Sequence, residues 1–526
     1  MNDKDIQFKP QAELLKGTQL LSDIVGMTIG PRGLAAAIDR GFDTWVITDG
    51  VNTARQIQLE DKVQNLGVRI LREAAIRTVD ESGDGTSATI VLGHAIFAEC
   101  FKMMSAGVNP MSLRKGLEDN SKLLIKELGK ISQPVSSLEQ TIQVATVSAE
   151  DSDLGELIAV TYEKIGKDGI LTVEESKTSE TTVDYQDGMQ FDSGYVSPYF
   201  VTDPNRMVST IEDAYILITD YALNAMQPLT PLLEKIANVT RNVILIAPEI
   251  GGSVLPSMIA TRINGGMNLN CINAPIMGSM QKEFLQDIAI LTGGTLISEG
   301  AGMKLEDVMP ENFGRARRVT STKNSTEIVG GKGTKDAIKE RILSLKEQLK
   351  GSTLSDYERE KLKERVAKLS NGVAVLKVGG QTEVEMKERR ERALDAVAAT
   401  KAALEEGIVP GGEITYLHLR KILDTEDFSA KILYNALEKP FKRLVENAGY
   451  DAGNLLAKLE GIKDYGHGFD VTDGKIKHMF KKGIVDPAKV IRNTIENSVS
   501  VGIQLSSIGA TIVPIIKEGG KDAGKN

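Results

Sequence analysis

Cysteine is nearly absent from this chain of 526 residues, since only Cys100 and Cys271 occur. Neither cysteine belongs to a metal-ligand spacing, which excludes a disulfide framework and a cysteine-based zinc site. Residues 1–10 contain charged side chains and no apolar segment of the kind that defines a secretory leader. We therefore expect reduced thiols and a cytoplasmic location.

An excess of basic charge is also lacking, because 63 Lys and Arg residues face 72 Asp and Glu residues, a net charge of −9. This balance offers no footprint for nucleic acid or for an anionic membrane. No run approaches the roughly eighteen apolar residues of a membrane span. With 41% hydrophobic and 26% charged residues, the composition is that of a soluble globular protein of several domains, and we expect neither nucleic acid nor membrane as a partner.

A Walker A string is missing as well, yet residues 82–89 combine glycines, hydroxyls and one carboxylate between two helical patterns, 62–79 and 90–100. The start of a helix presents unpaired N–H groups to an anion, and glycines let the backbone approach it closely. A carboxylate, Asp84, is repelled by a polyphosphate unless a cation lies between them, which indicates Mg²⁺. The stretch therefore predicts a phosphate loop that shares a metal.

Two other interpretations compete for this loop. Gly83-x-Gly85-x-x-Ala88 matches a loose dinucleotide fingerprint, but that motif follows a strand, and here a helical pattern precedes it. A plain helix N-cap, made by Asp84, Thr86 or Ser87, stays open. Two further glycine turns, residues 28–33 and 48–50, lie in the same N-terminal segment and favour one shared site.

The pattern along the chain changes twice. Residues 11–130 are mostly helical, residues 188–371 alternate short apolar β-rich runs with helical patterns, and residues 383–406 form one long charged helix. Helical pattern then continues nearly to the end, broken by the turn at 407–412. Residues 318–321 and 325–329 predict a hairpin, and Ser355 predicts a capping box for the helix that ends at Leu369. The two similar helical blocks around a different middle suggest a nested arrangement.

Several long strings resemble the group I chaperonins, the GroEL and Hsp60 type, in order and spacing. They are Thr28-Ile29-Gly30-Pro31-Arg32-Gly33, Thr48-Asp49-Gly50, Gly83-Asp84-Gly85-Thr86, Gly188-Met189-Gln190-Phe191-Asp192, Gly194-Tyr195-Val196-Ser197-Pro198-Tyr199-Phe200, Leu291-Thr292-Gly293-Gly294-Thr295, Thr382-Glu383-Val384-Glu385-Met386-Lys387 and Asp486-Pro487. The resemblance covers nearly the full chain except for the last dozen residues.

The resemblance implies a multidomain fold: a mainly α-helical equatorial ATP-binding domain, a small α/β intermediate domain, and an α/β apical domain inserted in the middle of the chain. The implied segments are 1–131 and 407–526 for the equatorial domain, 132–187 and 373–406 for the intermediate domain, and 188–372 for the apical domain. The implied function is an ATP-dependent chaperonin that captures non-native polypeptides and encloses them in a ring cavity. Its cofactors would be ATP and Mg²⁺, with K⁺ as a further candidate.

The implied partners are copies of the same chain in a ring, with seven subunits by resemblance, non-native client proteins, and a co-chaperonin of the GroES type. The implied nucleotide-binding residues are Thr28, Ile29, Gly30, Pro31, Asp84, Gly85, Thr86, Ser87, Ala88, Gly412, Asp470, Ile484 and Asp486. Asp84 is also the implied metal ligand, and Asp49, Asp84 and Asp395 are the implied catalytic carboxylates. Gly411 and Gly412 also have a simpler interpretation as a helix stop.

Asp395 follows Glu388 and Glu391 on the predicted long helix, so the pattern alone favours a solvated acidic face. By resemblance it is the carboxylate that activates the attacking water. A general base so far along the chain suits an ATPase gated by a domain motion.

The implied client-binding residues are apolar or small: Tyr195, Tyr199, Phe200, Thr230, Leu233, Leu255, Ile259 and Ala260. Spacing alone would place such residues in a core, whereas the resemblance places them on an exposed apolar mouth. Thr230 and Ala260 stand where larger aliphatic residues are usual, which predicts a weaker or differently selective mouth.

Three further departures concern the nucleotide site and the tail. Asp470 stands where many members of the family have asparagine, and an ionised carboxylate accepts hydrogen bonds but donates none. Thr48 replaces a common lysine, which affects the coordination of a monovalent cation. Residues 517–526 lack Gly-Gly-Met repeats, and we expect them to be disordered.

Two rival functions remain open from the sequence. One is a stand-alone Mg-ATP phosphotransferase, although no second substrate pocket can be named. The other is an assembly protein that keeps the chaperonin shape without turnover, against which the retained Asp49, Asp84 and Asp395 argue.

Overall fold

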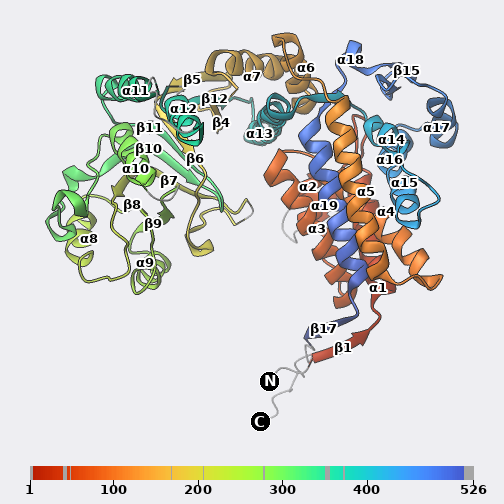
Figure 1. Cartoon of the computed structure of the whole chain (residues 1–526), viewed down its shortest axis with the longest axis horizontal. Coiled ribbons are helices and arrows are strands. Elements are labelled where there is room, and N and C mark those ends of the chain that lie inside the picture. Colours follow the sequence, from red (N-terminus) through yellow and green to blue (C-terminus); the bar gives the residue numbers. More distant parts are fainter. Residues whose placement is uncertain are drawn as a thin grey trace. The chain divides into compact units, whose positions relative to one another are not determined.

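The computed structural model describes residues 4–39, 44–47, 49–167, 169–204, 206–275, 279–349, 356–370 and 373–514. The chain divides into two compact units, one made of residues 1–160 and 391–526, the other of residues 161–390 (Figure 1). The middle of the chain is thus inserted into a unit built from both ends, in the nested order that the pattern suggested. The bounds of the five domain segments given above remain predictions, and Thr48, Ser355 and residues 517–526 lie outside the described residues.

The first unit, built from both chain ends, is mainly helical. Its helices are α1 (Gln11–Gly26), α2 (Gly50–Gln56), α3 (Lys62–Ser82), α4 (Thr86–Ser105), α5 (Pro110–Ile131), α6 (Leu138–Ala149), most of α7 (Ser152–Ile165), residues 391–406 of α13 (Glu383–Glu406), α14 (Ile414–Arg420), α15 (Phe428–Ala436), α16 (Lys439–Asn447), α17 (Ala452–Glu460), α18 (Met479–Lys482) and α19 (Ala488–Ser507). Each predicted helix of the N-terminal segment is confirmed, with boundaries shifted by a few residues.

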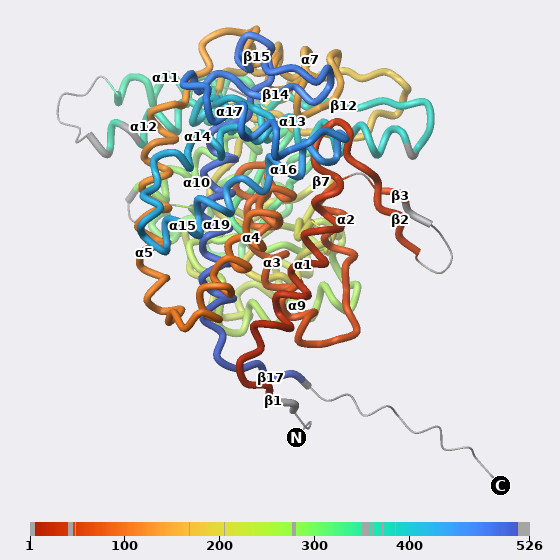
Figure 2. Tube along the Cα trace, turned by 90° about the vertical axis from the view of Figure 1, so that its right-hand side faces the viewer, coloured from red at the N-terminus to blue at the C-terminus, as the bar shows by residue number. Residues whose placement is uncertain are grey.

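Four antiparallel two-stranded sheets join the ends of these helices. They are β1 (Lys4–Phe8) with β17 (Ala510–Pro514), β2 (Ala36–Asp39) with β3 (Thr44–Ile47), β13 (Ile408–Pro410) with β16 (Val485–Pro487), and β14 (His467–Asp470) with β15 (Lys475–His478). Figure 2 shows that β1 and β17, from opposite ends of the chain, lie side by side. The pairing therefore joins the N-terminal and C-terminal segments of the first unit.

Helix α4 forms the centre of the first unit. Helices α1, α3 and α19 pack around it, and Figure 1 shows α19 running beside α5. Leu92, Ile96 and Phe97 are fully buried. Helix α4 is long and apolar enough to cross a membrane, so the expectation that no segment would have this length and composition is wrong. However, 67% of its most apolar 18-residue window is buried inside the protein. Burial of this kind is typical of a core helix.

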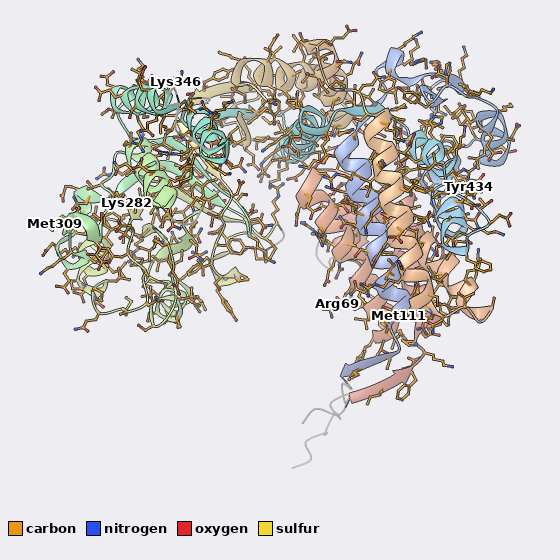
Figure 3. All side chains as sticks on the ribbon, viewed as in Figure 1. Arg69, Met111, Lys282, Met309, Lys346 and Tyr434 are labelled. Atoms are coloured by element: carbon orange, nitrogen blue, oxygen red, sulfur yellow. The ribbon has the colours of Figure 1, made fainter. Side chains whose placement is uncertain are left out.

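Helix α14 is fixed by a buried cation, Arg420. Its guanidinium donates to Glu438 at 2.9 Å and to Glu460 at 2.6 Å, and it stacks 4.5 Å from the centre of the Tyr434 ring, which Figure 3 labels on α15. One side chain thus connects α14 to α15, to α17 and to the residue that precedes α16. This connection holds the C-terminal end of α14 in place.

The second unit, residues 161–390, is α/β. Its six-stranded mixed sheet has the order β6 (Gly188–Phe191), β11 (Thr326–Gly331), β10 (Gly314–Ser321), β7 (Ser209–Ile218), β8 (Asn242–Ala247), β9 (Asn268–Asn273). The predicted hairpin is β10–β11. A smaller sheet has the order β4 (Ile170–Glu175), β12 (Val373–Val378), β5 (Thr182–Gln186). The helices are α8 (Thr230–Ala237), α9 (Val254–Ile263), α10 (Ser279–Thr292), α11 (Lys335–Leu349), α12 (Asp356–Ser370) and residues 383–390 of α13, with a 3₁₀ turn at Pro198–Phe200.

Strand β8 is apolar on both faces because helices cover both sides of its sheet. Val243 and Leu245 pack into the core with α8 and α9, whereas Ile244 and Ile246 pack into the core with α10. Alternate residues of a strand point to opposite faces, so a continuous apolar run fits a strand that is covered twice.

A buried ion-pair network joins α10, α11 and α12. Asp287 on α10, whose side chain is 1% exposed, accepts from Arg341 Nε at 2.7 Å and from Arg365 Nε at 2.6 Å. The Arg365 side chain is only 4% exposed. Removing one partner of a buried pair leaves the other charge without compensation in a medium of low polarity.

Replacing Asp287 with alanine should therefore destabilise the packing of α11 and α12 by roughly 3–5 kcal/mol. Hydrogen exchange measured on the full chain should show faster exchange in α10, α11 and α12, with the helices of the first unit unchanged. Glu283→Ala is the matched control, because Glu283 binds the same two arginines from a half-exposed position and should have a much smaller effect. Equal exchange rates in Asp287→Ala and the native chain would show that the network does not hold these helices.

Candidate nucleotide site

The first unit contains a cavity of about 540 Å³. Several predicted nucleotide-binding residues line it: Ile29, Gly30, Pro31, Gly412, Asp470, Ile484 and Asp486. The remaining lining residues were not predicted: Thr146, Val147, Glu150, Asp151, Ser152, Glu413, Leu444, Phe469, Val471, Thr472 and Met479. The predicted Thr28, Asp84, Gly85, Thr86, Ser87 and Ala88 do not line the cavity directly, so their relation to it depends on the loops described next.

The loop of residues 83–85 connects α3 to α4 in two left-handed steps. Gly83 has φ of 77° and ends α3, and Gly85 has φ of 98° and begins α4. A side chain on Gly85 would lie 2.8 Å from the Thr494 hydroxyl, and one on Gly83 would lie 2.0 Å from Cβ of Ala398 on α13. Both positions therefore require glycine, for conformation and for space.

The start of α4 is open to an anion. No side chain caps it, and the hydroxyl of Thr86, which is 4% exposed, has no hydrogen-bond partner. Unpaired amides and a positive helix end attract negative charge, and a buried hydroxyl without a partner is costly unless a ligand or water satisfies it. The plain N-cap interpretation fails here, because Asp84 accepts only from Gly85 N, at 2.6 Å, and does not cap the helix.

A buried hydroxyl network supports this loop from behind. Thr89 Oγ1 on α4 donates to Thr78 Oγ1 on α3 at 3.1 Å, and Asn497 Nδ2 on α19 donates to Thr78 Oγ1 at 3.0 Å. Ser498 Oγ donates to the Thr89 carbonyl at 3.2 Å. These hydrogen bonds connect α3, α4 and α19, and in this way they hold Gly85 in its position between α3 and α4.

The loops of residues 28–33 and 49–50 converge on the same region. Asn447 Nδ2 donates to the Ile29 carbonyl at 3.0 Å, which fixes the first loop against α16. Asp49 caps α2 by accepting from Val51 N and Asn52 N at 3.2 and 2.8 Å. A side chain on Gly50 would lie 2.0 Å from Ser87 Oγ, so the second loop touches the start of α4.

Carboxylates dominate the electrostatics of the cavity. Five of its lining residues are acidic, namely Glu150, Asp151, Glu413, Asp470 and Asp486, and none of the lining residues within the described ranges is Lys, Arg or His. An anionic ligand in such a cavity requires a cation.

The pKa values report this crowding of acids. Burial, and then the charges of Asp486 and Asp84, raise the pKa of Glu413 to about 8. Burial and Asp84 raise the pKa of Asp486 to about 7. The pKa of Asp84 itself is raised by burial, lowered by the Gly85 hydrogen bond, and raised again by Asp49 and Glu150. Although Asp84 keeps exposed surface, the protein around it removes enough water to disfavour its charged form.

The residues present fit a Mg²⁺ ion shared with a polyphosphate. No group of three or more His, Cys, Asp or Glu side chains in the described part of the chain is arranged to hold a metal alone. Mg²⁺ in phosphoryl-transfer sites takes one or two carboxylates and completes its shell with phosphate oxygens and water. Asp84, beside the uncapped start of α4, is the residue placed to supply such a carboxylate.

Asp395 lies on α13 with its side chain exposed. It precedes Ala398, the residue that packs against Gly83, by one helical turn. The helix that carries Asp395 therefore touches the loop that carries Asp84.

The sequence offered one overlooked signal, the acid that follows Gly411 and Gly412. Glu413 has φ of 60°, a left-handed conformation that is costly for a residue with a side chain. Glu150, at the end of α6, has φ of 52°. A carboxylate directly after two glycines was the signal for Glu413, whereas Glu150, Thr146, Leu444 and Met479 reach the cavity only through the fold.

The predicted client-binding residues lie in the second unit, and the structure divides them. Tyr199 is 65% exposed, Thr230 and Ala260 are exposed, and Leu233, Leu255 and Ile259 are half-buried. Phe200 is fully buried and Tyr195 nearly so. For these two the expectation of an exposed position is wrong, because both aromatic rings join the core of α8, α9 and β8.

Known proteins resemble this chain over nearly its whole length. The model of the TCP-1/cpn60 chaperonin family matches residues 21–514. A crystal structure of the chaperonin gp146 from the bacteriophage EL 2 (Pseudomonas aeruginosa), in the presence of ATP-BeFx, has a TM-score of 0.68 at 22% identity and covers 97% of this chain and 99% of that chain. A second crystal form of gp146 gives 0.63 at 21% identity, covering 98% and 99%. These similarities establish the fold.

The raised pKa of Glu413 predicts how stability depends on pH without nucleotide. Between 4.5, its ordinary pKa, and about 8, its folded pKa, the folded chain binds more protons than the unfolded chain, so the free energy of unfolding should fall as pH rises. Asp486 contributes in the same direction. In Glu413→Gln this fall should be smaller, as measured by the thermal unfolding midpoint across that range. Glu426→Gln, at an exposed position, should retain the native slope, and an unchanged slope in Glu413→Gln would refute the assignment.

Proposed function

The chain belongs to the TCP-1/cpn60 chaperonin family and has a chaperone role, and we propose that it is an ATP-driven chaperonin that captures non-native polypeptides and encloses them in a ring. The observation that carries the ATP-driven part is the open start of α4 beside Asp84, at a cavity whose lining has carboxylates and no cationic side chain. Such a site suits a polyphosphate that arrives with its metal.

The proposed nucleotide contacts follow from this geometry. The amides at the start of α4 and the hydroxyls of Thr86 and Ser87 hold phosphate oxygens, and Asp84 holds Mg²⁺. Bound Mg²⁺ would supply charge neutralisation at the phosphate oxygens. Gly30 and Gly412 both have positive φ, a conformation that favours glycine. Because glycine has no side chain, the backbone at these two positions can approach the ligand closely. The gp146 structures in the presence of ATP-BeFx support nucleotide binding by this fold.

Hydrolysis is assigned to Asp395. A carboxylate within hydrogen-bond reach of a water can take its proton as that water attacks phosphorus. The packing of Ala398 on Gly83 brings the Asp395 helix to the phosphate loop, and Asp49 adds a negative charge that acts on Asp84. A small shift of α13 would then control whether a water is held.

Client capture is assigned to the exposed part of the predicted set, centred on Tyr199. Exposed apolar surface binds unfolded segments because its burial contributes roughly 25 cal/mol per Å² and requires no fixed sequence. Phe200 and Tyr195 support this surface from the core.

Assembly into a ring of identical subunits, seven by resemblance, is part of the proposal, as are a GroES-type co-chaperonin, K⁺ as a further candidate cofactor and a cytoplasmic location. Exposed apolar side chains on short sheets support self-association: Ile6, Phe8 and Ile512 on β1–β17 are 55, 77 and 60% exposed. Negative-stain electron microscopy with and without ATP tests the ring and its response together. The phosphotransferase and the inactive assembly protein are the alternatives that phosphate release and client assays distinguish.

Asp395→Ala should slow hydrolysis by about 10²–10⁴-fold, the usual contribution of a positioned general base, with little change in nucleotide affinity. The phosphates would still be held at Thr86 and Ser87 and the metal at Asp84. Bound nucleotide and released phosphate should be followed in one preparation after rapid mixing. Asp84→Ala provides the contrast, since it should lose Mg-dependent binding and turnover together. Parallel loss of both in Asp395→Ala would make Asp395 a structural residue.

Tyr199→Glu should weaken capture of an unfolded client by about thirtyfold or more, since aromatic anchors at interfaces contribute about 2 kcal/mol or more. Basal ATP turnover should stay close to native, because Tyr199 lies outside the cavity-bearing unit. Suppression of client aggregation is the measurement. Leu343→Glu is the control, as Leu343 is 62% exposed on α11 and outside the predicted set. Equal suppression by Tyr199→Glu and Leu343→Glu would contradict the assignment.

A further inference from the structure

Met207, in the second unit, combines an exposed apolar side chain with an uncommon backbone conformation. Its φ is 52° and the residue is 47% exposed. This left-handed region is costly for a residue with a side chain, whereas glycine adopts it freely. Among the residues other than glycine with positive φ in the described part of the chain, namely Lys9, Glu150, Met207, Asp213 and Glu413, only Met207 is apolar. A large apolar side chain is thus kept on the surface at a conformational cost.

Hydrogen bonds on two sides hold the turn that carries Met207. Asp203 N donates to the Val208 carbonyl at 3.0 Å, and Val208 N donates to the Asp203 carbonyl at 3.2 Å. The Tyr195 hydroxyl donates to the Met207 carbonyl at 3.3 Å. The Tyr195 ring itself is 7% exposed and packs in the core of α8, α9 and β8. A ring fixed in the core therefore holds the backbone of an exposed methionine.

The turn directly continues the segment that carries Tyr199. Thr202, three residues after Tyr199, donates from its backbone N to the Val208 carbonyl at 2.9 Å, and Val208 follows Met207. Along this path Tyr199 and Met207 are separated by at most roughly 20 Å, from the reach of three residues, one strand-to-strand step and one further residue. An extended segment of about six residues has the same length. One short stretch of an unfolded chain is therefore long enough to contact both side chains.

We propose that Met207 contacts apolar side chains of non-native polypeptides, and that Tyr195 is a positioning residue that acts through Met207. This inference rests on the proposed function. The thioether of methionine is unbranched and polarisable, and it adapts to partners of irregular shape. The exposed part of the predicted set has one large side chain, Tyr199, beside the small Thr230 and Ala260. Met207 adds flexible apolar area next to that rigid ring.

Met207→Gly tests the contact, because glycine suits this φ and the change removes only the side chain. On the full-length protein, the affinity for a reduced, carboxymethylated unfolded protein labelled with a fluorophore should fall by about fivefold. Met207→Leu, which keeps the apolar area, should retain most of the affinity. Leu343→Ala is the matched control and should bind as the native chain does, since Leu343 is 62% exposed on α11, a helix that packs in the core of α10.

Tyr195→Phe tests the positioning role, because it removes the hydroxyl and leaves the ring in the core. The affinity for the same unfolded protein should fall by about twofold to threefold in the native background and should not change further in the Met207→Gly background. Without the thioether, the hydroxyl has no side chain left to position. An equal loss in both backgrounds would make Tyr195 independent of Met207 and would overturn the positioning role.

The two claims fail in different ways. If the native chain binds the unfolded protein and Met207→Gly binds it equally well, the inference is wrong and the proposed function stands. If the native chain binds no unfolded protein at all, the proposed function itself is wrong. Met207→Asn provides a second variant should Met207→Gly not fold, since asparagine also tolerates this conformation and its side chain is polar. Native affinity in Met207→Asn overturns the inference in the same way.

Discussion

The burial of helix α4 is the constraint on which the rest of the first unit depends. Its apolar side chains, such as Leu92, Ile96 and Phe97, are stable only when other helices surround them, and α1, α3 and α19 do so. Because the core encloses the helix from its first turn, its N-terminal amides are held at a fixed place beside a cavity. The shape of the loop at residues 83–85 is therefore a consequence of core packing, and the positive φ of Gly83 and Gly85 lets the chain turn sharply between α3 and α4.

The acidic lining of the cavity is the second organising feature, and it opposes the first. A positive helix end attracts an anion, while the ionised acids among the five acidic lining residues repel it. An anion with a bound cation satisfies both, because the helix end attracts the anion and the acidic residues attract the cation. The raised pKa values of Glu413 and Asp486 show how strongly the cavity disfavours further negative charge when neither is bound. Under the proposed function, binding of nucleotide, cation and protons would be linked through the same group of side chains.

In the second unit, the position of an apolar residue within a short turn decides whether its side chain lies in the core or on the surface. The 3₁₀ turn that carries Tyr199 and Phe200 directs one ring outward and the next into the core, so neighbouring aromatic residues have different roles. Asp287 and its two arginines then fix the helices on the opposite face of the sheet. A firm core beneath an exposed aromatic ring suits a surface that binds without a fixed sequence.

The sequence by itself determined the helices, the hairpin, the glycine loops and the long helix that bears Asp395, because these depend on spacing and on local backbone conformation. The change of pattern along the chain suggested the nested order, and strings of family residues added the predicted nucleotide-binding residues. Only the tertiary structure decided that Phe200 is buried, that Glu413 and Glu150 face the cavity, and that Lys477 and Thr472 occupy Asp470. Burial and partner choice arise from side chains that the fold brings together, and local periodicity contains no information about which partners those will be.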